Sequence, residues 1–150
     1  MKSIIVMEVG KAPEKVAVRK HVGLGTLQRY LGENTVLTVV SRKIGSEWFD
    51  IWLDDEGLLK PKPYIKAICT NAHEVLCGTL IIAKHDSQGN TIGLTDEECD
   101  LVYIYTTKPK RDKLNLFGRD GDELICYIDY PSSERLRFKS KDELVLTYEG

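Results

Sequence analysis

The 150-residue chain lacks long apolar runs, an excess of charge of either sign and the paired cysteines of a disulfide scaffold. No stretch approaches the ~20 apolar residues that a membrane-spanning helix needs. The opening apolar run, residues 4–7, is followed at once by Glu8 and is too short for the core of a secretion signal. We therefore expect a soluble cytoplasmic protein that has no membrane partner.

The absence of a charge excess bears on nucleic-acid binding. The chain has 21 basic and 23 acidic residues and a formal net charge of -2. A protein of this balance has no global field to attract a polyanion. Any contact with nucleic acid must therefore be made by a local basic segment.

The four cysteines are widely spaced and include no CxxC pair. They lie in apolar surroundings, which is typical of buried thiols in a reducing compartment. These cysteines are Cys69, Cys77, Cys99 and Cys126.

Common catalytic and cofactor motifs are also missing. The sequence has no GxSxG, and Gly23-Leu24-Gly25 lacks the third glycine of GxGxxG and the GK[ST] of a P-loop. His73-Glu74 does not continue to HExxH, because Cys77 stands where the second histidine belongs. We predict a protein that is not an enzyme and has no catalytic residue and no cofactor.

One metal-binding alternative stays open. Cys69, His73 and Cys77 are spaced i, i+4, i+8, so a helix would place all three on one face as part of a zinc site. The segment runs into a strand pattern, where the three side chains would not converge. We predict no metal site and keep a metal-dependent enzyme at these residues as an alternative.

Composition and pattern predict one α+β domain. The chain is 42% hydrophobic and 29% charged, which is ordinary for a globular domain of this length. Residues 3–9 and 14–19 predict a β-hairpin, and the apolar residues on both faces of 47–53 predict a central strand. The remaining strand patterns are 35–41 and 75–84, and Gly78 in the latter suggests a bulge or a close approach of another backbone.

Two short helices are predicted. Leu24, Leu27, Tyr30 and Leu31 follow helical spacing over residues 25–31, and Gly32 fits a C-cap. Residues 95–98 have the capping-box form T-x-x-E and predict a helix that runs to about residue 103, with Leu94 and Cys99 as a hydrophobic staple.

The C-terminal part differs in pattern. Residues 106–121 are polar, basic and rich in turn formers, and strand patterns at 123–130, 134–139 and 143–149 predict a small antiparallel meander. The predicted fold is α+β: a mixed or antiparallel sheet with two short helices and a C-terminal antiparallel β meander. Residues 1–105 form the core, and 106–150 form a basic linker plus a β extension packed on the same domain.

Several short motifs, in order, resemble a known family. They are VMEVGK at residues 6–11, YLG at 30–32, DEGLL at 55–59 before a proline segment, CGTLII at 77–82 and GLTDEE at 93–98. About residues 1–105 resemble an uncharacterised domain of unknown function that is common in bacteriophages, plasmids and mobile elements. In that family the proline segment continues into an Asn-Arg pair, whereas Ile65 and Lys66 stand here. The resemblance implies a phage or mobile-element accessory protein in the cytoplasm of a bacterial host cell and no established activity.

Two basic segments are the candidate ligand site. Residues 108–113 combine five charged side chains with nearby aromatics, a composition suited to phosphates and a stacked base. A solvated loop is the alternative for residues 108–113. The proline segment carries a second, thinner positive group. The candidate residues are Lys60, Lys62, Tyr64, Lys66, Tyr105, Lys108, Lys110, Arg111 and Lys113.

These features support two hypotheses of function besides the metal-dependent enzyme. The first is a non-catalytic counter-defence protein that binds a small anionic, nucleotide-type signal or a host defence protein. The second is a nucleic-acid-binding regulator that uses residues 108–113. We also expect a homo-oligomer, paired through an edge of the C-terminal strands.

Overall fold

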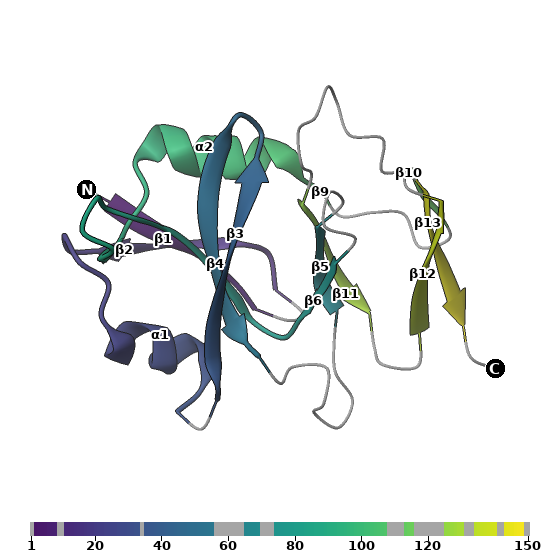
Figure 1. Ribbon diagram of the computed structural model, residues 1–150, viewed down its shortest axis with the longest axis horizontal. Helices are drawn as coiled ribbons and strands as arrows, with labels where there is room; N and C mark the ends of the chain where they lie inside the picture. The colour runs from purple at the N-terminus through teal and green to yellow at the C-terminus, as the bar shows by residue number, and fades with distance from the viewer. Residues whose placement is uncertain are drawn as a thin grey trace.

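The computed structural model describes residues 2–8, 11–33, 35–55, 65–69, 74–107, 113–115, 125–130, 134–140 and 143–148 (Figure 1). Side chains are described within 2–8, 11–33, 35–55 and 76–104. Neither helix of this described chain is long and apolar enough to cross a membrane.

A six-stranded antiparallel sheet forms the centre of the fold. Its path runs β2-β1-β7-β4-β3, and β8 pairs with β7 beside that path. The predicted N-terminal hairpin is confirmed as β1 and β2, and the predicted central strand is confirmed as β4, between β7 and β3. The strands are β1 (Lys2–Met7), β2 (Glu14–Val18), β3 (Leu37–Ile44), β4 (Glu47–Asp54), β7 (Leu80–His85) and β8 (Thr91–Ile92).

Two helices cover opposite faces of this sheet, α1 (Leu24–Leu31) and α2 (Asp96–Tyr105) (Figure 1). The core on the α1 side includes Leu27 and the partly buried Trp52, and the core on the α2 side includes Phe49 and Val102. Because strand side chains alternate between faces, β4 contributes to both cores. The α+β class with an antiparallel sheet and two helices is therefore confirmed.

Both predicted helix-end signals are confirmed. The Thr95 hydroxyl accepts from the Glu98 N–H at 3.2 Å, and the Glu98 carboxylate accepts from the Thr95 N–H at 2.8 Å, which completes the capping box of α2. At the end of α1, Gly32 has a φ of 107° and donates its N–H to Gln28 O at 2.8 Å. These local contacts fix where the helices begin and end.

The predicted single strand over residues 75–84 is wrong. The segment forms β6 (Glu74–Cys77) and β7, which belong to different sheets. Gly78, between them, has a φ of 79°, a left-handed conformation that an extended ladder does not accommodate. Gly78 therefore ends one strand instead of forming a bulge within it.

The other strands form two smaller sheets. One has the order β6-β5-β11-β9, with β5 (Ile65–Cys69), β11 (Ile125–Tyr130) and β9 (Thr106–Thr107). The other has the order β10-β13-β12, with β10 (Lys113–Asn115), β13 (Glu143–Tyr148) and β12 (Glu134–Ser140). A three-stranded meander over 123–149 is not shown, because β11 pairs with β5 and β9. The division at residue 105 stays a prediction.

Candidate functional site

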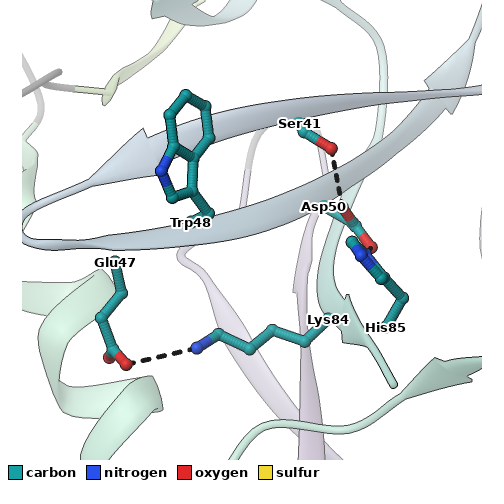
Figure 2. A pocket seen from close by; sticks show the side chains of 6 residues that line it. All are labelled: Ser41, Glu47, Trp48, Asp50, Lys84 and His85. Atoms are coloured by element: carbon teal, nitrogen blue, oxygen red, sulfur yellow. Dashed lines mark hydrogen bonds and ion pairs between the residues drawn. The ribbon is translucent and has the colours of Figure 1, made fainter. Parts of the chain in front are cut away.

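A hollow of about 540 Å³ lies between the tip of the β3–β4 hairpin and the end of β7 (Figure 2). It falls in the size range of small-molecule sites. The described side chains that line it are Ser41, Glu47, Trp48, Asp50, Lys84 and His85.

Strand register explains why polar side chains meet there. Directly paired residues of an antiparallel ladder share a face, so the pairs Ser41–Asp50 and Asp50–Ala83 place these residues on one face. His85, two residues beyond Ala83, belongs to the same face. This is the face that α1 covers farther along β4, near Trp52.

Asp50 is a buried acid that contacts two other side chains of the hollow. Only 6% of this residue is exposed, and burying a carboxylate is costly unless it is hydrogen-bonded. Ser41 Oγ donates to one carboxylate oxygen at 3.0 Å, and His85 Nδ1 lies 2.7 Å from the other. Since an ionised carboxylate only accepts, Nδ1 carries the proton. The ring of His85 is thus held in place with Nε2 left to meet a ligand.

The same three side chains do not form a hydrolase triad. In a triad the imidazole lies between the serine and the carboxylate, so that it can take the serine proton. Here Asp50 lies between Ser41 and His85. The imidazole is therefore not placed to take the proton of Ser41, and the arrangement is better suited to orienting the imidazole than to the attack of a triad serine.

Lys84 joins three elements beside the hollow. Its Nζ lies 3.4 Å from a Glu47 carboxylate oxygen, forms an ion pair with Glu98 on α2 and stands 4.9 Å from the centre of the Phe49 ring. Desolvation acts to lower the pKa of Lys84, but the hydrogen bonds and charges of Glu98 and Glu47 outweigh it and raise that pKa. The positive charge of Lys84 is therefore neutralised by Glu47 and Glu98, and these ion pairs connect β7 to the β3–β4 hairpin and to α2.

Trp48 forms an exposed wall of the hollow. It is 61% exposed, although large aromatic side chains gain most from burial. Figure 2 shows its indole on the opposite side of β4 from the Glu47 side chain, which points toward Lys84. The indole face is therefore available to a planar group that enters the hollow.

The described side chains around this hollow include none of the residues predicted from sequence as a ligand site. Only the backbone is described for Lys66, Tyr105 and Lys113, in β5, at the end of α2 and in β10. The other candidates, Lys60, Lys62, Tyr64, Lys108, Lys110 and Arg111, lie outside the described residues.

The strands next to the two basic segments share one sheet. β5 begins at Ile65, opposite Tyr130 of β11, and β9 ends at Thr107, opposite Cys126. Because β11 is antiparallel to β5, β5 begins beside the C-terminal end of β11. Because β9 is parallel to β11, the chain leaves β9 toward that same end. Whether the basic side chains share a cleft stays a prediction.

The backbone does not support a metal site at the three spaced residues. Cys69 pairs with Glu74 and Cys77 pairs with Ile65, so the two cysteines lie at opposite ends of the β5–β6 pair. Four residues of strand correspond to about 13 Å, whereas a shared zinc ion needs sulfurs about 2.3 Å from the metal. Burial also raises the pKa of the Cys77 thiol to about 11, which keeps it protonated. His73 lies outside the described residues.

The sequence interpretation missed the residues of the hollow. The available signal was in residues 47–53, where Asp50 interrupts an apolar strand between two tryptophans on the same face. An acid at such a position predicts a polar partner across the sheet. It does not say that the partners are Ser41 and His85, since the latter lies 35 positions away.

Comparison with known proteins gives one match. Residues 1–108 match the family described as Domain of unknown function (DUF3846). No curated protein and no solved structure matches the chain.

Proposed function

The chain belongs to the DUF3846 family, and from that premise we propose that it is a non-catalytic binding protein for a small nucleotide-type ligand. The ligand occupies the hollow between the β3–β4 hairpin and β7. The observation that carries the proposal is that one hollow is lined by the exposed Trp48 and by an imidazole that Asp50 holds in a fixed orientation.

The indole of Trp48 suits the base of the ligand. Stacking on an aromatic side chain is the usual way that proteins hold a nucleobase, because every base has a planar face. With 61% of Trp48 exposed, the protein does not need this ring for its own core. The ring is therefore a binding surface that the fold presents.

The imidazole of His85 suits the phosphate. When protonated, its Nε2 donates to a phosphate oxygen while Nδ1 keeps its bond to Asp50. Lys84 does not serve this purpose, because Glu47 and Glu98 already neutralise it. The hollow thus offers one planar contact and one directional polar contact, enough to orient a mononucleotide.

The two basic segments remain part of the proposal as contacts for further phosphates. Support comes from the shared sheet of β5 and β9, which brings the described ends of both segments to one β11 strand. The contacts are those predicted from sequence in residues 60–66 and 105–113. A ligand with several phosphates, or a nucleic acid, uses them more than a mononucleotide does.

The biological setting follows from the resemblance of residues 1–105 to proteins of phages and mobile elements. In that setting, a non-catalytic protein that holds a nucleotide lowers the concentration of a signal that the host uses for defence. A protein of the host defence system is the other partner that this setting suggests.

Calorimetry of the whole chain against cyclic and linear mono- and dinucleotides tests the proposal. We expect one ligand per hollow and a roughly tenfold to hundredfold loss of affinity in Trp48→Ala, with partial retention in Trp48→Phe because a ring remains. Ile104→Ala, which removes a 69% exposed apolar side chain from α2, is the matched control. Absence of binding by every nucleotide, or equal affinity in Trp48→Ala, contradicts the proposal.

A further inference from the structure

Strand β3 is an open edge of the central sheet. It has eight residues, pairs with β4 in an unbroken register, and has no second strand partner in the described chain. The other edge, β2, has five residues, and its Lys15 forms an ion pair with Asp96 of α2. Long, regular edge strands are templates for pairing with another strand.

The backbone groups on this edge can be assigned. Asp55 donates its N–H to Val36 O at 2.7 Å, so residues 36 and 55 form a hydrogen-bonded pair. In an antiparallel ladder such pairs alternate, and the even-numbered residues of β3 therefore direct their N–H and C=O groups toward β4. The odd-numbered residues direct theirs away from the sheet. These are Leu37, Val39, Ser41 and Lys43.

The edge also exposes two valines. Val36, just before β3, is 49% exposed, and Val39, within the strand, is 42% exposed. The two cations, Arg42 and Lys43, lie toward the hairpin end. Arg42 Nη1 donates to Ser41 O at 2.8 Å, but a carbonyl oxygen accepts a second bond.

We propose that β3 pairs with β3 of a second copy of this chain, antiparallel, about a twofold axis that passes beside Val40. This register places Val39 opposite the partner's Ser41 and Leu37 opposite the partner's Lys43. It uses all four outward-facing residues of each copy. It also places Arg42 opposite the partner's Thr38, so no like charges face one another.

Other positions of the twofold axis along β3 give less favourable pairing. An axis beside Arg42 places two arginines directly opposite, which is destabilising. An axis beside Val39 or Ser41 leaves outward-facing backbone groups of β3 without a partner in β3 of the other copy. The strand is therefore self-complementary in one register.

The dimer also enlarges the hollow described above. Ser41 lines that hollow, and the partner's Val39 lies opposite Ser41 on the same face of the joined sheet. The partner copy thus adds an apolar side chain next to each hollow. Dimer formation itself does not depend on the proposed ligand.

Charge reversal at Thr38 tests the register in the whole chain by sedimentation equilibrium. Position 38 faces the partner's Arg42 in a pair without backbone hydrogen bonds, where side chains approach most closely. We expect Thr38→Glu to tighten and Thr38→Arg to weaken the dimer, each by roughly tenfold, because two such pairs form per dimer. Each variant serves as the steric control for the other.

A proline pair provides a second test. Val39→Pro removes an N–H that points away from β4, so we expect a monomer with a nearly unchanged melting temperature. Val40→Pro removes an N–H that bonds β4, and we expect it to lower the melting temperature. A wild-type chain that is monomeric at every concentration overturns the proposal. So does a dimer whose dissociation constant is the same in Thr38→Glu, Thr38→Arg and Val39→Pro.

Discussion

Asp50 shows how one buried side chain can serve both the fold and a site. Its carboxylate is nearly inaccessible and is satisfied by Ser41 and His85. The contact that offsets the cost of burying the acid is the contact that orients the imidazole. The structural role of Asp50 and its proposed role in binding are therefore the same interaction.

Glu98 gives a pH-dependent prediction at the residue scale. Desolvation acts to raise its pKa, but hydrogen bonds from Lys84 and Thr95 outweigh it and hold the pKa below the ordinary 4.5. A lowered folded-state pKa means that the stabilisation is present above the unfolded value and is lost as pH falls through the folded value. Wild-type stability should therefore decline on acidification below about pH 4.5 in part through this group.

Glu98→Gln isolates that contribution. Glutamine can still serve in a capping box, so the change removes mainly the ion pair with Lys84. We expect a loss of about 1 kcal/mol at neutral pH and a shallower decline in acid, measured by urea unfolding across pH. Glu97→Gln, at the neighbouring exposed position, is the control. Parallel pH profiles for wild type and Glu98→Gln would rule out this role.

At the scale of elements, alanine substitutions of one glycine within α1 and of the glycine that caps it should change stability in opposite directions. Gly25 lies within the helix, and a Cβ there meets no atom within 4 Å. Gly32 ends the helix at a φ of 107°, and a Cβ there lies 3.1 Å from Thr35 Cγ2. We expect Gly25→Ala to stabilise the chain by about 0.5–1 kcal/mol and Gly32→Ala to destabilise it by about 1–2 kcal/mol.

Thermal and chemical unfolding measure both changes, and each variant is the control for the other. Equal effects of the two substitutions would contradict the assigned helix end. The same pair also addresses Gly23-Leu24-Gly25, because a tolerated side chain at Gly25 is expected of a helix-entry turn and not of a turn that a phosphate must approach closely.

At the scale of the whole molecule, the four-stranded sheet β6-β5-β11-β9 brings together distant parts of the sequence. β11 lies between β5 and β9, although the family match ends at residue 108. A fragment of residues 1–108 lacks β11 and leaves both neighbouring strands without that partner. We expect it to keep the central sheet by circular dichroism, to melt at a lower temperature than the whole chain and to aggregate more readily.

An equal melting temperature for fragment and whole chain would contradict this expectation. Hydrogen exchange provides a finer measurement, since amides of β5 should lose protection in the fragment while those of β1 and β7 keep it. Protection lost equally in all three strands would mean that the central sheet itself depends on residues 109–150.

The sequence by itself determined the local elements. The capping box at Thr95 and Glu98, the C-cap at Gly32, the N-terminal hairpin and the central position of β4 follow from contacts within a few residues or from the two apolar faces of one strand. Such signals are readable because backbone conformation and side-chain alternation depend on near neighbours.

Only the tertiary structure decided which side chains meet. Gly78 divides one apolar run between two sheets, and the register of β3, β4 and β7 brings Ser41 and His85 to the same carboxylate. A shift of one residue in either pairing would send these side chains to the other face. Register is set by the packing of both faces and of both helices together, so the hollow beside Trp48 is a property of the assembled sheet and not of any segment within it.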